Sequence, residues 1–194
     1  MGDARTANMS ERLEPLVADA VKARSGGAVV TIRAIRPDDG ERIVRAFQAL
    51  EPRSIYLRFF SPKGELGAEE VRRVTEPDPA RQAALVATVP TGDLDEMIVA
   101  LGEYVGSGAS ADIAFAVGDD YQGRGIASRL LQHLVSIARG KGISRFEADV
   151  LVENTPMLKV FRHSGLPVTA SEEDGVVHVT LTLGDGTARG SRCP

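Results

Sequence analysis

The strongest constraint on the fold of this chain is an apolar run that turns through two glycines into an amphipathic segment. The run covers Ile113–Val117, the turn is Gln122–Ala127 (QGRGIA), and the amphipathic segment extends from Ile126 to Arg139. A strand that leads into a helix in this way leaves backbone N–H groups unpaired at the positive end of the helix dipole. Such a helix start binds phosphate or pyrophosphate groups, and the two glycines would let the backbone approach the anion closely. The pattern therefore predicts a site for a phosphate-bearing ligand.

Short strands and helices alternate along the rest of the chain. The apolar pattern predicts strands at 29–35, 83–89, 96–105, 111–117, 143–152, 167–171 and 176–183. It predicts helices that start at 37 and that cover 54–60, 68–75, 126–139 and 154–164. This order favours an α+β fold, with a central mixed, mostly antiparallel sheet of about six to seven strands flanked by helices.

The domain organisation follows from the same pattern. We expect an N-terminal helical extension at 1–27, one domain at 28–184 and a flexible C-terminal tail at 185–194. Apolar residues at helical spacing predict that the extension forms a helix from Met9 to Ala23, with Ser10 as its N-cap. This helix either packs on the domain or mediates a homodimer, and its apolar stripe is compatible with both.

Composition restricts the classes of function. The net charge is −4 and no basic patch with interleaved aromatic residues occurs, which argues against nucleic-acid binding. No apolar run is long enough to cross a membrane, and the polar N-terminus carries no secretory signal. Cys193 is the single cysteine, so no internal disulfide can form, and a cytoplasmic protein is the simplest interpretation. No group of His, Cys and Asp has the spacing of metal ligands.

Two common phosphate-binding loops do not fit the sequence. A Walker loop requires Gly-Lys-Ser/Thr, which does not occur in this chain. A dinucleotide fingerprint requires a third glycine or an alanine at the position of Ser128. The acidic residue at a suitable distance downstream, Glu147, would sit in the middle of a strand instead of near its end. We therefore disfavour both nucleotide-binding classes.

The loop resembles a different family. Gln122, Gly125 and Ala127 form a Gln-x-x-Gly-x-Ala pattern that resembles the acyl-CoA pyrophosphate loop of the GNAT superfamily, the acyl-CoA-dependent N-acyltransferases. Downstream, Asn154-x-x-Met157 followed by Phe161-x-x-x-Gly165-Leu166 is similar to the second cofactor-side motif of that superfamily. The resemblance covers residues 29–183, including the order of elements, and implies a GNAT-like fold.

Two further segments resemble the catalytic domain of bacterial protein lysine acetyltransferases. They are Arg33-x-x-Arg36-Pro37-x-Asp39 and the segment Arg53–Ser61 (RSIYLRFFS). The resemblance implies an enzyme that moves the acetyl group of acetyl-CoA to a protein lysine side chain, by direct attack of the amine on the thioester. It implies no metal.

The resemblance also assigns the contacts to acetyl-CoA. Backbone N–H groups of the loop would hold the pyrophosphate, and the preceding strand would pair with the pantetheine arm and polarise the thioester carbonyl. The residues so assigned are Phe115, Ala116, Val117, Gln122, Gly123, Arg124, Gly125, Ile126, Ala127, Asn154, Met157 and Phe161. Asn154 is equally explained as a helix cap. Many members of the superfamily use a tyrosine to protonate the leaving thiolate at the position of Phe161, which cannot do so.

Asp112 is the first candidate for the general base that deprotonates the amine. Alternation along the strand 111–117 places it on one face with the small Ala114 and Ala116, which leaves room for a ligand. A bulge would shift this phase. Related lysine acetyltransferases carry glutamate here, so the shorter aspartate favours a proton path through water. The alternative interpretation is a solvated charge at a strand edge.

Two other carboxylates remain open as candidates. Asp149 shares a strand face with Glu147, and a pair of carboxylates on a strand indicates either a groove for a cation or a solvated face. Glu103 faces the same side of its strand as Val99 and Leu101 and is the third candidate.

Three functions are consistent with these features. The first is acetyl transfer to protein lysines, and the second is the same chemistry on a small-molecule amine. The third is a non-catalytic domain that binds or senses acyl-CoA. A mildly acidic surface tolerates a cationic acceptor, which is compatible with the first two.

Overall fold

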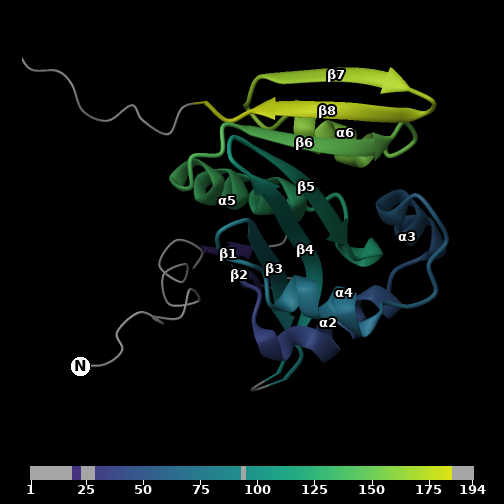
Figure 1. The fold of residues 1–194 in the computed structure, drawn as a ribbon. Helices are drawn as coiled ribbons and strands as arrows, with labels where there is room; N and C mark the ends of the chain where they lie inside the picture. The colour runs from purple at the N-terminus through teal and green to yellow at the C-terminus, as the bar shows by residue number, and fades with distance from the viewer. Residues whose placement is uncertain (1–18, 23–28, 93–94, 185–194) are drawn as a thin grey trace, which may run out of the picture.

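The core of the structure is one eight-stranded sheet with the strand order β1-β2-β3-β4-β5-β6-β8-β7 (Figure 1). It is taken from a computed structural model, which describes residues 19–22, 29–92 and 95–184. The strands are β1 (Asp19–Lys22), β2 (Val29–Ala34), β3 (Gln82–Pro90), β4 (Glu96–Ser107), β5 (Ser110–Val117), β6 (Arg145–Leu151), β7 (Val168–Glu173) and β8 (Val176–Thr182). Neighbouring strands run antiparallel except β5 and β6, which are parallel. The predicted mixed, mostly antiparallel sheet is confirmed.

Helices cover both faces of this sheet. They are η1 (Pro37–Asp39), α2 (Gly40–Gln48), α3 (Pro52–Phe59), α4 (Ala68–Thr75), η2 (Asp119–Tyr121), α5 (Ile126–Gly140) and α6 (Thr155–Arg162). Figure 1 shows α2 and α4 on one face and α5 on the other. None of the helices in the described ranges is long and apolar enough to cross a membrane.

The burial pattern explains why the helices sit where they do. Every residue from Ala83 to Val89 in β3 is buried, because α5 packs on one face of the strand and the α2–α4 layer on the other. In α5 the buried residues Ile126, Leu130, Leu134 and Ile137 recur at helical spacing and form one continuous face. The larger core lies under α5 and α6, and the smaller one under α2 and α4.

The parallel pair β5 and β6 creates the main opening in the sheet. Helix α5 forms the crossover that a parallel pair requires. The two strands are in register over only three pairs, from Ser110↔Arg145 to Asp112↔Glu147. Beyond these pairs β5 continues beside β4 to Val117, whereas β6 continues beside β8 to Leu151. The two strands therefore separate and leave a gap in the middle of the sheet.

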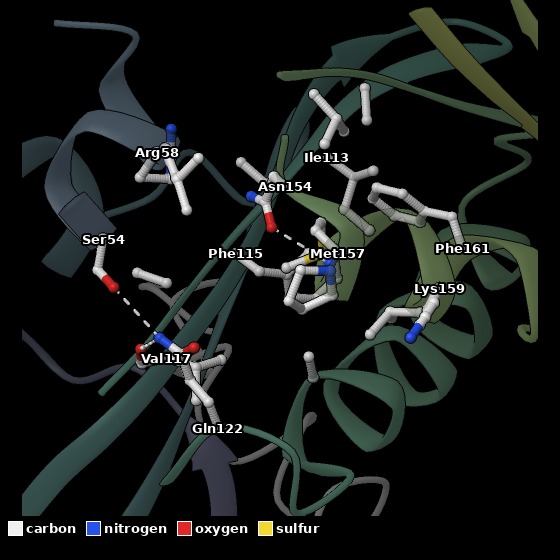
Figure 2. Close-up of a pocket in the computed structure, with 18 of the residues that line it drawn as sticks. Ser54, Arg58, Ile113, Phe115, Val117, Gln122, Asn154, Met157, Lys159 and Phe161 are labelled. Carbon is white, nitrogen blue, oxygen red and sulfur yellow. Dashed lines mark hydrogen bonds between the residues drawn. The ribbon is translucent and has the colours of Figure 1, made fainter. Parts of the chain in front are cut away.

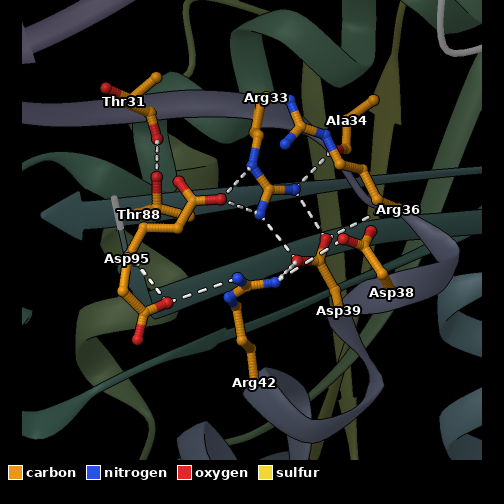
Figure 3. A network of polar contacts seen from close by, with 10 residues as sticks. Thr31, Arg33, Ala34, Arg36, Asp38, Asp39, Arg42, Thr88 and Asp95 are labelled. Atoms are coloured by element: carbon orange, nitrogen blue, oxygen red, sulfur yellow. Dashed lines mark hydrogen bonds and ion pairs between the residues drawn. The ribbon is translucent and has the colours of Figure 1, made fainter. Parts of the chain in front are cut away.

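A network of charges fixes the first half of the sheet to η1 and α2 (Figure 3). Asp39 is fully buried, and its two oxygens accept from Arg33 Nη1 at 2.7 Å and Nη2 at 2.8 Å. Arg36 N–H donates to the same carboxylate at 2.9 Å, and Arg33 also binds Glu96 at the start of β4. Burial opposes ionisation, but these hydrogen bonds and nearby positive charges prevail and lower the pKa of Asp39. The Arg33–Asp39 motif therefore has a structural role.

The prediction of a helix from Met9 to Ala23 is wrong for the part that the structure describes. Residues Asp19–Lys22 form β1, which pairs antiparallel with β2. The unpaired backbone groups at the edge of β2 provide partners for a strand, and this long-range pairing overrides the local helical pattern. Residues 9–18 and 23 lie outside the described residues. The division into extension, domain and tail stays a prediction.

Candidate active site

A cleft of about 970 Å³ occupies the gap between β5 and β6 (Figure 2). One side is formed by the loop before α5, the first turn of α5 and the cleft-facing side of α6. The other side is formed by α3, through Ser54, Leu57 and Arg58. Both sides of the sheet contribute residues, because the strands have separated at this point.

The loop before α5 has the backbone geometry of an anion site. Gly123 and Gly125 have φ values of +70° and +79°, a conformation that favours glycine, and Gly125 is the N-cap of α5. The first intrahelical hydrogen bond runs from Arg129 N–H to Gly125 O at 3.2 Å. The N–H groups of Ile126, Ala127 and Ser128 precede this bond, so they are the free donors of the helix start. All three residues line the cleft.

Arg124 does not take the position that its sequence context suggests. Its guanidinium lies over the ring of Tyr121, 5.0 Å from the centroid, and the residue does not line the cleft. All the other residues predicted to contact acetyl-CoA do line the cleft. Their role in binding stays a prediction.

The strand β5 presents an open edge to the cleft. It pairs with β4 along its length, but beyond Asp112 no strand in the described part of the chain pairs with its other edge. Ala114 and Ala116 are small and half-buried on this segment, so a ligand could lie along the strand. The predicted alternation is confirmed, because Ala111, Ile113 and Phe115 are buried on the opposite face.

Phe161 of α6, Phe115 of β5 and the N-cap residue Asn154 line the part of the cleft next to α6. Phe161 is buried and contacts Phe115, with ring centroids 6.1 Å apart. Asn154 Oδ1 accepts from Met157 N–H at 3.2 Å, so the helix-cap interpretation of this residue is confirmed (Figure 2). Asn154 also lines the cleft, so its predicted contact to acetyl-CoA stays a prediction beside its role as a helix cap.

Asp112 is the carboxylate at the base of the cleft. It is exposed, it lines the cleft, and among the described residues it has no hydrogen-bond or ion-pair partner. Glu147, the register partner of Asp112, does have side-chain partners. Arg145 Nε and Ser110 Oγ both donate to Glu147 Oε1 at 2.9 Å.

The other two candidate acids have partners. Asp149 lines the cleft, and its Oδ1 lies 2.6 Å from His178 Nδ1 on the neighbouring strand. Glu103 does not line this cleft. It forms an ion pair with Arg58 Nη2 at 2.9 Å and faces a neighbouring cavity of about 810 Å³.

Several residues at the cleft were not assigned from the sequence. Lys159 on α6 and His163, the C-cap of that helix, lie four residues apart, and both line the cleft. Ser54 of α3 contacts Asp119, and only its place in the Arg53–Ser61 segment marked it beforehand. No group of three metal-ligating side chains occurs in the described part of the chain.

Comparisons with known proteins point to one family. The model of the Acetyltransferase (GNAT) family matches residues 58–166. The acetyltransferase Pat of Mycolicibacterium smegmatis is 35% identical over 149 residues, which cover 75% of this chain and 43% of Pat. This chain thus spans less than half the length of that curated relative.

Solved structures agree with this result. The GNAT domain of S. lividans PAT is 36% identical with a TM-score of 0.74, and the match covers 84% of this chain and 96% of that one. The structure of yncA from Salmonella typhimurium with its cofactor acetyl-CoA has a TM-score of 0.64. At 17% identity, over 84% of this chain and 99% of the other, yncA supports the fold alone.

Proposed function

The chain belongs to the GNAT acetyltransferase family, and on that premise we propose that it transfers the acetyl group of acetyl-CoA to the side-chain amine of a protein lysine. The observation that carries the proposal is the cleft at the β5–β6 gap. It has free helix N–H groups at one end and, at its base, the carboxylate of Asp112, which has no side-chain partner in the described ranges. The two ends match the two chemical demands of acetyl transfer, a held anionic donor and a deprotonated amine.

Hydrogen-bond donors and a cation on the donor side of the cleft suit the negative charge of an acyl-CoA. The N–H groups of Ile126, Ala127 and Ser128 would hold the pyrophosphate, since they are the free donors of α5. The open edge of β5 beyond Asp112 would pair with the amide groups of the pantetheine arm. Lys159 adds a cation on the cleft-facing side of α6. When bound, acetyl-CoA supplies the activated acyl thioester.

The side chains of the cleft would accept and donate the protons that move during acetyl transfer. The acceptor ammonium first loses a proton to Asp112, directly or through water, which frees the lone pair of the nitrogen. The neutral amine then forms a bond to the thioester carbonyl carbon, and the C–S bond breaks. Asp112 is favoured over Asp149 and Glu103 because those two carboxylates already bind His178 and Arg58. Phe161 cannot donate a proton to the leaving thiolate, so the thiol proton comes from the substrate amine or from water.

Acidic side chains on the acceptor side favour a cationic amine. Asp112, Glu147 and Asp149 all line the cleft, and carboxylates attract an ammonium group before it loses its proton. A protein lysine is preferred over a free amine because the relatives at 35% and 36% identity are Pat acetyltransferases. A small-molecule acceptor is the alternative outcome of the experiment below.

The experiment incubates the purified full chain with acetyl-CoA and two acceptor panels, lysine peptides and free amines. Products are detected by mass spectrometry, because Cys193 would react with a thiol reagent used to follow CoA release. We expect acetyl groups on lysine Nζ. Transfer only to free amines would contradict the proposed acceptor. Binding of acetyl-CoA without transfer to any acceptor would instead identify a non-catalytic sensor.

A further inference from the structure

The N-terminus of α3 is bound to the segment that leads into the cofactor loop. Asp119 Oδ2 accepts from Glu51 N–H at 2.9 Å, and Asp119 Oδ1 accepts from Ser54 Oγ at 2.5 Å. Glu51 is the N-cap of α3, and its own side chain makes no capping hydrogen bond. Asp119 therefore caps α3 from a position 68 residues away in the sequence. Its charge also suits the positive end of the helix.

Gln122, the first residue of the loop, joins the same cluster. Its Nε2 donates to Ser54 Oγ at 3.2 Å (Figure 2). The same atom donates to Asp119 Oδ1 at 3.1 Å and to Val117 O at 3.2 Å. The end of β5, the start of the loop and the first turn of α3 thus share one set of hydrogen bonds. Any movement of α3 relative to the loop would break several of them.

Helix α3 also forms the wall of the cleft opposite the cofactor loop, which is the loop 122–127 before α5. Ser54, Leu57 and Arg58 line the cleft from this helix. Arg58 in addition holds Glu103 on β4, which lies on the same face of the sheet as Asp112. The distance between α3 and the loop therefore sets the width of the cleft where donor and acceptor must meet.

We propose that Asp119 is a positioning residue for acetyl transfer. It holds α3 against the cofactor loop, so that the wall of the cleft formed by α3 stays at a fixed distance from the bound acetyl-CoA. This inference rests on the proposed function. Asp119 acts through Ser54 and Glu51 and does not itself line the cleft. A displacement of about 1 Å between reacting groups can cost about 100-fold in rate, so loss of the clamp would reduce turnover more than donor affinity.

The test compares Asp119→Asn and Ser54→Ala with the matched control Asp120→Asn. Asp120 is the next residue, it is exposed, and the described residues show no hydrogen bond or ion pair to it. Three quantities are measured: kcat/KM for a lysine acceptor, the Kd of acetyl-CoA by calorimetry, and amide hydrogen exchange in α3 with and without acetyl-CoA. The exchange measurement detects the clamp directly and does not require turnover.

We expect Asp119→Asn to lower kcat/KM for the acceptor by about tenfold or more and to speed exchange in the first turn of α3. The Kd of acetyl-CoA should change by less than about threefold, and Asp120→Asn should match the wild type in all three. Ser54→Ala should act in the same direction. The double variant should lose less than the sum of the two single losses, because the Ser54–Asp119 hydrogen bond is common to both substitutions.

Faster exchange without a loss of kcat/KM would overturn the positioning role, as would unchanged exchange and kinetics. If Asp119→Asn does not unfold cooperatively and is therefore misfolded, the kinetics and exchange of Ser54→Ala test the positioning role instead. Ser54→Ala leaves the hydrogen bond from Glu51 N–H to Asp119 in place. A wild type that transfers no acetyl group would contradict the proposed function. Exchange in α3 would then still show whether Asp119 holds the helix.

Discussion

Asp112 on β5 and Glu147 on β6 are register partners in the last parallel pair before the two strands separate. Arg145 and Ser110 both hold Glu147 at 2.9 Å. Asp112 has no such partner among the residues that the structure describes. The point at which the sheet opens therefore carries one engaged carboxylate and one that is free to accept a proton.

The first prediction concerns Asp112. Asp112→Asn keeps the size of the side chain but removes the base, so kcat should fall by roughly 100- to 10,000-fold. The Kd of acetyl-CoA should stay close to that of the wild type, because the donor contacts lie on the loop and on the edge of β5. Steady-state kinetics with a lysine peptide and calorimetry with acetyl-CoA measure the two quantities.

Variants of the other carboxylates complete this experiment. Glu172→Gln, an exposed change on β7 outside the cleft, should leave kcat unchanged. Glu103→Gln should lower kcat less than Asp112→Asn, because Glu103 is paired with Arg58. If Asp149→Asn alone abolishes transfer, the base is Asp149 and its partner His178 shares the role.

The fold was predictable from the sequence to the extent that it depends on local pattern. The helix predicted at 68–75 has the same bounds as α4, and the alternation along β5 placed Asp112 opposite Ile113 and Phe115 as observed. Both follow from periodicity, because a residue's face on a strand or helix depends only on its neighbours in sequence.

The contacts that define the cleft depend on register and could not be predicted in this way. Ser54 meets Asp119 across 65 residues, and Arg58 meets Glu103 across 45. Asp149 meets His178 because β6 pairs with β8, which the strand order in the sequence does not specify. The same limit explains β1, since its pairing with β2 is a long-range interaction that helical spacing could not reveal.

The second prediction concerns the N-cap of α5. Gly125→Ala forces a residue with a Cβ to adopt φ +79°, which costs about 1–2 kcal/mol and shifts the N–H groups of the loop. We expect the Kd of acetyl-CoA to rise about tenfold, as measured by calorimetry. Gly140→Ala at the other end of the same helix is the control. A Cβ there meets nothing within 4 Å and alanine favours helix, so affinity should be unchanged. Wild-type affinity in Gly125→Ala would mean that the loop does not hold the donor.

The third prediction concerns the buried ion pair of Asp39 and Arg33. Asp39→Asn removes the negative charge and one of the two acceptor oxygens that face the Arg33 guanidinium, so it should lower the free energy of unfolding by about 3 kcal/mol in urea titrations. Asp38→Asn is the control, because the Asp38 side chain is 75% exposed and the Asp39 side chain 0%. A loss in Asp38→Asn as large as that in Asp39→Asn would show that general surface charge, and not the buried pair, is responsible.

The same pair predicts an acid dependence. The pKa of Asp39 is lower in the folded chain than in the unfolded chain, despite its burial, because of the hydrogen bonds from Arg33 and Arg36. The pair therefore stabilises the fold above the ordinary aspartate pKa of about 3.9 and loses this effect as the pH falls below that value. Unfolding titrations at pH 3 to 6, taken as a rough range around that pKa, should show a smaller loss of stability in Asp39→Asn than in the wild type.

The fourth prediction concerns a buried hydroxyl. Tyr104 is fully buried against Phe146, and no hydrogen-bond partner for its hydroxyl occurs among the described residues. Removing an unsatisfied polar group relieves its desolvation cost, so Tyr104→Phe should match the wild type in stability or exceed it by about 1 kcal/mol. Tyr56→Phe on the exposed side of α3 is the control and should have no effect.

Alkaline unfolding distinguishes Tyr104 from other groups. Burial raises the pKa of Tyr104 to about 12, whereas the unfolded chain ionises this residue near its ordinary value of about 10. The wild type should therefore lose stability as the pH rises from about 10 to about 12, and Tyr104→Phe should lose less. Burial lowers the pKa of Lys141, whose Nζ lies 5.7 Å from the centroid of the Tyr104 ring, but Lys141 is present in both proteins, so the difference between them reports Tyr104. If Tyr104→Phe is clearly less stable at neutral pH, the hydroxyl has a hydrogen-bond partner in solution, such as a buried water, and the pKa argument fails with it.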